Sequence, residues 1–252
     1  MNPGAGPSAR AAVCRVKAVS DAVDEFGEQF PAQALRILRH CLGACRVNHL
    51  CQSTTADSIR SGVINPVTAA LRSSLERILG RRIDNAMWCQ ATLPAEMGGL
   101  ALQDPQHSAE AARLACLVKT GKLICDLGVP PEVWQAATVR ALECFNTRWG
   151  FTMAVPKASK ELQHDLTRMV HGKLRDELVA TSPAEAEARM SSITTPNATR
   201  WVVSPSPWFA LAPCEFRAAM RWILGVPIRP AAYTCPSCGA AADAREFMLF
   251  PV

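Results

Sequence analysis

The chain has 252 residues and a formal net charge of +5, with 49% hydrophobic and 19% charged residues. This length predicts one or two domains with a sizeable core, and this composition excludes a disordered polymer. No run reaches the roughly 18 apolar residues of a membrane-spanning helix, and the first residues lack the apolar stretch of a secretory signal. We therefore expect an intracellular protein of the nucleus or cytoplasm, with no membrane partner.

The 11 cysteines indicate the same compartment. They are scattered without the spacing of a disulfide framework, and several fall inside helical apolar patterns, where free cysteine packs as a small hydrophobic residue. Only Cys235 and Cys238 have the close spacing of a metal or redox site.

The predicted elements are almost all helices. After a Gly/Pro/Ser-rich start, apolar residues recur at three- and four-residue steps, and Pro, Ser and Gly mark the ends. Helices are predicted over 11–27, 31–43, 66–80 with Asn65 as N-cap, 107–125, 131–145, 157–179, a short stretch after Pro183, and 214–225.

The segment 93–104 differs from these helices. Its Gly98-Gly99 pair predicts a turn that leads into a short extended or buried stretch containing Leu100 and Leu102. No alternating pattern is long enough to build a sheet, so the predicted fold class is mainly α, an irregular helical fold with a short cysteine-containing tail.

Four segments follow from these patterns. They are a start with the first helix over 1–29, a helical region over 30–150, a helix with a Ser/Thr/Pro linker over 151–212, and a helix with the cysteine tail over 213–252.

The positive charge is concentrated between residues 36 and 82. This window holds eight arginines, two acids and no lysine, a net charge of +6. Arginine forks match the geometry of phosphate, so the window suggests a nucleic-acid contact. The alternative is that these arginines form the solvated faces of ordinary amphipathic helices, and charge alone does not decide between the two.

Familiar catalytic patterns are absent from the sequence. There is no phosphate-binding glycine loop, no His-Glu-x-x-His and no Gly-x-Ser-x-Gly. The five histidines form no pair with the spacing of metal ligands, and the adjacent acids Asp24-Glu25 and Asp176-Glu177 are typical of solvated helix faces. No catalytic residue is therefore nominated.

The motif with the most specific chemical meaning in the sequence is Cys235-Pro-Ser-Cys238-Gly239. Two thiolates at this spacing are half of a tetrahedral zinc site. The residues after Cys238 contain no further Cys or His, so a closed site needs a distant ligand such as Cys214 or a partner chain. Zinc is therefore expected only with an incomplete ligand set.

Four motifs, read in order, resemble one family. ALRILRHCLGACRVNHLCQST (34–54) resembles the segment after the polymerase palm in LINE-type, non-LTR retrotransposon reverse transcriptases, where the pattern is Arg-x-Asn-His/Tyr-Leu-Leu-Arg. WCQATLPAEMGGLALQD (88–104) resembles the family's Gln-Ala-x-Leu-Pro-x-x-x-Gly-Gly-Leu-Gly-Leu, with Ala101 in place of a glycine. AEAARLACL (109–117) is similar to its alanine-rich run, and EFRAAMRWILGVPIRPAAYTCPSCGAAAD (215–243) to its helix, Arg-Leu-Gly-Leu-Pro and zinc tail.

The resemblance covers residues 30–243 and implies a thumb-like region that grips a template–primer duplex through its backbone. The predicted phosphate contacts are Arg36, Arg39, Arg46, Arg72, Arg81 and Arg82. Asn48 and His49 either support them or form turns and caps. Gly98 and Gly99 are expected to serve backbone geometry.

The departures from the family decide the expected activity. The palm, with its metal-binding aspartates, would lie upstream, and the end of the zinc tail is replaced by residues 245–252. We therefore expect a truncated or frame-shifted fragment that does not polymerise alone. Its partners would be an RNA or DNA backbone, the missing polymerase portion or another protein. A helical protein-interaction scaffold and a non-functional relic of a decayed element are the alternatives.

Overall fold

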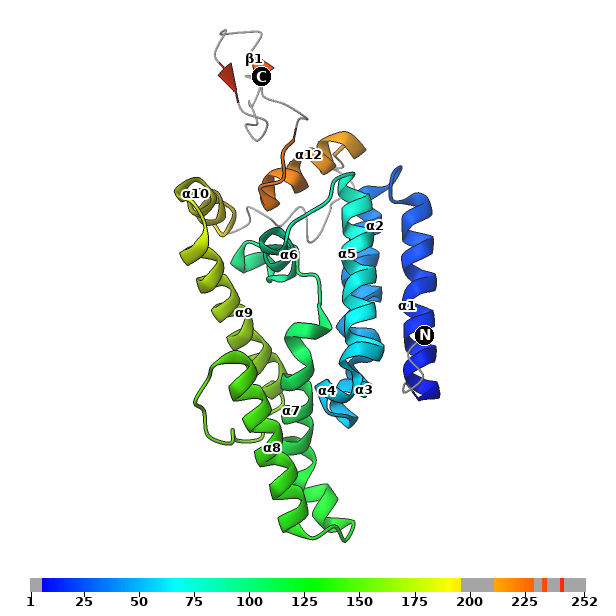
Figure 1. Cartoon of the computed structure of the whole chain (residues 1–252), viewed down its shortest axis with the longest axis vertical. Helices are drawn as coiled ribbons and strands as arrows, with labels where there is room; N and C mark the ends of the chain where they lie inside the picture. Colours follow the sequence, from blue (N-terminus) through cyan, green and yellow to red (C-terminus); the bar gives the residue numbers. More distant parts are fainter. Residues whose placement is uncertain (1–5, 196–210, 229–232, 235–240, 243–252) are drawn as a thin grey trace. The chain divides into compact units, whose positions relative to one another are not determined.

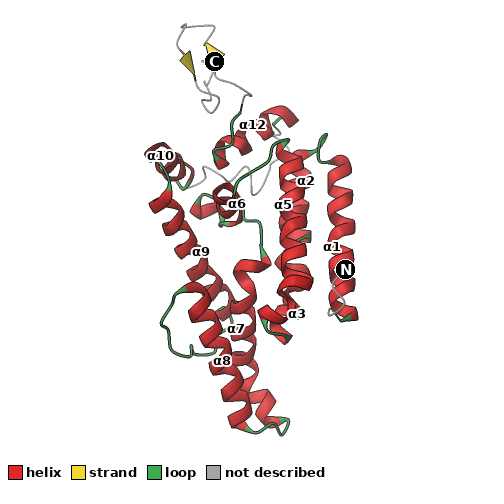
Figure 2. Ribbon diagram, in the orientation of Figure 1, coloured by secondary structure: helices red, strands yellow, loops and turns green. Residues whose placement is uncertain are grey.

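The computed structural model describes residues 6–195, 211–228, 233–234 and 241–242. They are mainly helical, which confirms the predicted fold class (Figures 1 and 2). The α-helices are α1 (Pro7–Phe26), α2 (Pro31–Cys41), α3 (Ala44–Ser53), α4 (Ala56–Ile59), α5 (Asn65–Leu79), α6 (Asn85–Thr92), α7 (Pro105–Asp126), α8 (Pro131–Trp149), α9 (Leu162–Thr181), α10 (Ala184–Ile193) and α12 (Pro213–Leu224).

Short elements complete the described structure. Arg60–Ile64 form a π-helical turn, η1, and Ala95–Met97 a 3₁₀ turn, η2. The two-residue strands β1 (Tyr233–Thr234) and β2 (Ala241–Ala242) pair antiparallel. The helices α3, α4 and α6 are additions to the elements expected from the sequence.

Prolines and capping side chains set several helix starts. Pro105 and Pro131 occupy the first turns of α7 and α8, where a missing N–H costs no hydrogen bond. The Asp104 carboxylate accepts a hydrogen bond from Gln106 N at 2.9 Å, and the Asp84 carboxylate accepts one from Met87 N at 2.8 Å. Both carboxylates satisfy N–H groups that the helix leaves unpaired.

The expected N-cap at Asn65 is wrong. Asn65 has helical angles (φ −60°, ψ −46°), because α4 and η1 lead directly into α5. Pro66 lacks the N–H that a regular helix needs, and a π-helical turn is one way in which a helix accommodates such an interruption. The Asn65 side chain instead accepts a hydrogen bond from Gln106 Nε2 at 3.4 Å.

The chain divides into two compact units built from interleaved segments. One unit contains residues up to Asp21, Arg39–Leu71 and Gln103–Lys173, and the other contains Ala22–Leu38, Arg72–Leu102 and the residues from Leu174 onward. Four of the five divisions fall inside α1, α2, α5 and α9, and the fifth falls between η2 and α7. We call the two the first and second unit.

In the first unit, α7 packs against both α3 and α8. The α7 residues that face its neighbours are mostly small, and Ala109, Ala112 and Ala115 are almost fully buried. Helices α7 and α8 run antiparallel (Figure 1). Alanine-lined faces allow helix axes to approach closely, so this unit is held mainly by close helix packing.

In the second unit, an apolar cluster joins α6 to α9 and α10. Leu93, Leu178 and Met190 form its buried centre, and Met97 and Leu174 pack against it. The cluster holds the chain around Gly98-Gly99, the turn that the sequence predicts. Leu100 and Leu102 after that turn are buried without forming a strand, in line with a short buried segment.

Candidate nucleic-acid interface

The structure separates the predicted phosphate-binding arginines by exposure. Arg36 on α2, Arg46 on α3, and Arg81 and Arg82 after α5 are exposed. Within the described residues, none of these four makes an ion pair with a carboxylate. Arg46 donates from Nε to Cys41 O at 2.6 Å, which leaves its other N–H groups available.

Arg39 differs from these four, because it is only 6% exposed. Burial lowers the pKa of its guanidinium. A buried guanidinium does not reach a phosphate backbone from this position, and we therefore leave Arg39 out of the candidate phosphate contacts.

Arg72 holds the chain between α5 and α6. Its Nη1 donates to Asn85 Oδ1 at 2.9 Å, its Nη2 donates to Ile83 O, and its Nε lies 3.5 Å from Glu76 Oε1. Glu76 in turn accepts a hydrogen bond from Ile83 N at 3.2 Å. These contacts give Arg72 a structural role that its place in the arginine-rich window does not reveal.

Asn48 and His49 both lie inside α3, not in a turn or a cap. The Asn48 Oδ1 accepts a hydrogen bond from Gln163 Nε2 at 2.8 Å, and Gln52 Nε2 donates to Gln163 Oε1 at 3.2 Å. Asn48 therefore ties α3 to α9 within the first unit. His49 is exposed beside this contact, on the surface of α3.

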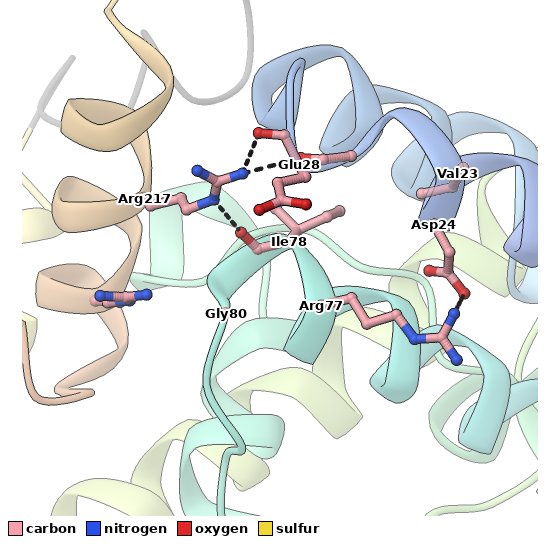
Figure 3. Close-up of a pocket in the computed structure, with 9 residues that line it drawn as sticks. Val23, Asp24, Glu28, Arg77, Ile78, Gly80 and Arg217 are labelled. Atoms are coloured by element: carbon pink, nitrogen blue, oxygen red, sulfur yellow. Dashed lines mark hydrogen bonds and ion pairs between the residues drawn. The ribbon is translucent and has the colours of Figure 1, made fainter.

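Two arginines outside the predicted window meet the end of α5. Arg217 donates from Nε to Ile78 O at 3.0 Å and from Nη2 to the carbonyl oxygens of Gly27 and Glu28 (Figure 3). Arg221 donates from Nε to Leu79 O at 2.7 Å. These bonds satisfy carbonyls that the ends of helices leave unpaired.

The sequence carries one signal for this pair. Arg217 and Arg221 are four residues apart on an amphipathic helix, so they share one face. Their partners lie about 140 residues earlier in the chain, and no local pattern predicts that pairing.

Arg77, Arg81, Arg217 and Arg221 form what we call the basic cluster. Burial lowers the pKa of Arg221 most, and the positive charges of Arg81 and Arg217 lower it further. Both charged groups that perturb Arg221 are therefore cations. Arg77 makes an ion pair with Asp24, a carboxylate whose side chain is only 9% exposed.

A pocket of about 460 Å³ lies at the basic cluster. The end of α1, the end of α5 and the helix α12 line it, all within the second unit. Figure 3 shows Arg77 reaching toward Asp24 and Arg217 reaching toward the backbone at Glu28 and Ile78. Glu28 is the other acid in the lining, and it is exposed.

The Gly98-Gly99 turn has strict backbone requirements. Gly98 has φ +86°, and a Cβ on Gly99 would lie 2.0 Å from Leu93 O. Ala101 has φ +55°, a left-handed conformation that favours glycine, and its N donates to Leu93 O at 2.8 Å. The two glycines serve backbone geometry here, as expected.

Gln90 links this turn to α12. Its Nε2 donates to Gly98 O at 3.0 Å and to Ile223 O at 2.7 Å, and its Oε1 accepts from Arg189 Nη1 at 3.2 Å. Gln90 is 2% exposed, so these bonds replace the water that its amide loses. Two of the motifs that carry the resemblance are thus in direct contact.

Two histidines meet in the first unit. The rings of His107 and His171 lie 6.3 Å apart, and His107 is 5.9 Å from the Trp149 ring. Burial lowers the pKa of His107, and burial together with the charges of His107 and His164 lowers the pKa of His171 to about 4. Both rings are therefore neutral at pH 7.

The predicted zinc ligands Cys235 and Cys238 lie outside the described residues. Cys214, their candidate third ligand, is exposed in the first turn of α12. Across the described ranges, no group of three or more His, Cys, Asp or Glu side chains is placed to hold a metal ion. None of the helices in these ranges is both long and apolar enough to span a bilayer.

No family model matches the chain, and no match was found among curated proteins or solved structures. The functional interpretation therefore depends on the geometry of the residues themselves.

Proposed function

We propose that the chain binds the phosphate backbone of nucleic acid without reading its sequence, and that residues 30–243 correspond to the post-palm region of a LINE-type reverse transcriptase. The observation that supports binding most is the exposed set Arg36, Arg46, Arg81 and Arg82. These side chains make no ion pair among the described residues, whereas Arg60, Arg72 and Arg77 do.

Unpaired arginines are suited to this task. The guanidinium keeps its charge at all physiological pH values and presents a fork of N–H donors that fits two phosphate oxygens. Contacts of this kind release counterions from the nucleic acid and carry no base information. Binding should therefore depend steeply on salt and weakly on sequence.

The geometry of the motifs supports the proposed family relationship. Ala101, which stands where the family has a glycine, has the positive φ that would select a glycine. Gln90 of one motif donates to Ile223 O of another, 133 residues away. The positive φ at residue 101 explains why a glycine would suit that position, and the bond to Ile223 O explains why a glutamine suits position 90.

The test is binding to a labelled RNA–DNA hybrid over a salt series. The triple variant R36Q/R81Q/R82Q should lower affinity roughly tenfold or more near 0.1 M salt, and should reduce the salt slope by up to about three, one for each lost contact. A steep slope for the wild-type chain supports the proposal, and absent binding at low salt by a folded chain contradicts it.

The matched control removes the same charge elsewhere. Lys122, Arg140 and Lys157 are exposed and have no ion pair among the described residues. We expect K122Q/R140Q/K157Q to bind the hybrid as the wild type does. Equal losses in both triple variants would show that net charge, and not these particular arginines, governs binding.

Polymerisation is not part of the proposal, because no catalytic aspartate pair is identified in these 252 residues. A primer-extension assay with the purified chain should give no product. Extension above background that survives repurification would require a catalytic site that the motifs do not indicate.

One observation favours the scaffold alternative. Leu123 and Leu127 at the end of α7 and Val133 at the start of α8 are more than half exposed. Binding through such apolar side chains is weakly sensitive to salt. The salt series therefore distinguishes protein contact at this turn from backbone contact by arginine.

A further inference from the structure

The pocket at the basic cluster has the dimensions of a small-molecule site. Its volume of about 460 Å³ falls within the range of roughly 300–1,000 Å³ that is typical of such sites. Its walls come from three parts of the second unit, namely the α1–α2 turn with Glu28, the end of α5 with Gly80, and Arg217 and Arg221 of α12.

The charges that line this pocket are not balanced. Arg77 is paired with Asp24, but neither Arg217 nor Arg221 makes an ion pair with any described residue. Repulsion from Arg81 and Arg217 acts on Arg221, which is already partly buried. A cationic site of this kind is stabilised by an anion, because partial burial reduces the screening by water.

The guanidinium groups are held in place before any ligand binds. Carbonyl oxygens of Ile78 and Leu79 fix Arg217 and Arg221 through Nε, and Arg221 also donates from Nη1 to Ile228 O at 3.4 Å and from Nη2 to Leu79 O. Gly80 allows Arg221 to approach the helix end, since a Cβ there would lie 3.1 Å from Arg221 Nη2. The Nη1 of Arg217 donates to no described residue, so a donor remains for a ligand.

We propose that this pocket binds a terminal phosphate group. A phosphate monoester has nearly two negative charges at pH 7 and three strong acceptor oxygens, and arginine is the residue that best matches that geometry. The inference is separate from the proposed nucleic-acid contacts, because none of Arg36, Arg46, Arg81 and Arg82 lines the pocket.

The first test looks for a gain of affinity, which misfolding does not imitate. Glu28 is an exposed acid in the pocket wall, and its charge opposes a bound anion. Inorganic pyrophosphate titrated calorimetrically should bind E28Q roughly two- to fivefold more tightly than the wild type. The matched control E25Q removes an exposed acid of α1 that does not line the pocket, and its affinity should stay at the wild-type value.

The second test looks for a loss. R81Q removes an exposed charge that acts on Arg221 and should weaken pyrophosphate binding roughly threefold. R36Q removes an exposed charge that is also a proposed nucleic-acid contact but does not act on Arg221, and it should leave pyrophosphate binding unchanged. The absence of pyrophosphate binding up to about 10 mM, or equal effects within either matched pair, would overturn the proposal.

A third arm separates the two sources of phosphate. A 5′-phosphorylated trinucleotide is compared with the same trinucleotide carrying a 5′-hydroxyl, and E28Q is titrated with both. Tighter binding of the phosphorylated form, enhanced in E28Q, assigns the pocket to the end of a nucleic acid. Equal binding of the two forms, together with E28Q-sensitive pyrophosphate binding, assigns it to free phosphates or nucleotides.

Discussion

Ala101 has a left-handed backbone with φ +55°, in the turn where the family resemblance places a glycine. An L-residue in this region costs about 1–2 kcal/mol, and a glycine costs about 0.5–1 kcal/mol through the unfolded chain. We expect A101G to raise the free energy of unfolding by about 0.5–1 kcal/mol, measured by urea denaturation.

A helical alanine provides the control for that substitution. Ala136 is exposed in the middle of α8. A136G should lower the free energy of unfolding by about 1 kcal/mol, the opposite sign, because glycine has a low helix propensity. Loss of stability in both variants would show that the turn around Ala101 does not need a positive φ.

The buried histidines predict a loss of stability in acid. The pKa of His171 is about 4 in the folded chain, against about 6.5 when unfolded. Because the folded pKa is the lower of the two, the unfolded chain takes up the proton first, and stability falls as the pH drops from 6.5 toward 4. Allowing for partial exposure, the loss is on the order of 2 kcal/mol.

The slope of stability against pH isolates this residue. The H171Q variant should have a flatter dependence of unfolding free energy between pH 7 and pH 5 than the wild type. His107 carries its own lowered pKa, set by burial and modified by Asp104, Arg148 and Glu110, so part of the slope should remain. The exposed H49Q variant should keep the full slope, and a similar slope in H171Q would contradict the argument.

At the scale of elements, two helical glycines have opposite surroundings. A Cβ on Gly121 of α7 would lie 2.2 Å from Trp134 Cζ2 of α8. The indole is held by its own hydrogen bond from Nε1 to Leu117 O at 2.7 Å, so it does not yield freely. We expect G121A to destabilise the chain by about 2 kcal/mol through overpacking.

Gly172 of α9 is the matched case. No atom lies within 4 Å of the position of a Cβ there, so alanine gains helix propensity without a clash. G172A should stabilise the chain by up to about 1 kcal/mol in the same urea measurement. If both alanines stabilise, α7 and α8 are packed less closely than the structure indicates.

A helix can be predicted from the sequence when the residues of that helix themselves form a clear apolar face. The apolar stripe of α5, with Leu71, Leu75 and Leu79, is sufficient to predict that helix. Helix α6 is missed because it buries the polar Gln90 against partners remote in sequence. The π-helical turn before Pro66 is missed because Asn-Pro is also a typical helix start.

For the whole molecule, the sequence locates the arginines but not their functions. The window from 36 to 82 contains both Arg81, which is exposed, and Arg72, which bonds to Asn85. The sequence pattern does not distinguish these two arginines. Arg217 and Arg221 lie outside the window and complete the basic cluster only through tertiary contacts. A charge pattern can therefore predict that the chain has an anion site. It does not predict which residues form that site.

The Gln90 amide is a long-range link within the second unit. It bonds Ile223 O of α12 and Gly98 O of the turn, and it accepts from Arg189. Leucine at this position would remove the side-chain hydrogen bonds to Gly98 O and Ile223 O, while Ile223 O keeps its bond from Arg189 Nη1. A buried carbonyl that loses its partner costs about 1–3 kcal/mol, so we expect Q90L to destabilise the chain by about 2 kcal/mol.

The local consequence is specific to α12. Because Gln90 fixes the end of that helix, amide hydrogen exchange in Phe216–Leu224 should speed up more in Q90L than exchange in α8 does. The control Q135L replaces an exposed glutamine of α8 and should leave both rates unchanged. Uniform acceleration over all helices in Q90L would instead indicate general destabilisation, and would remove Gln90 as the link that holds α12 to the Gly98-Gly99 turn.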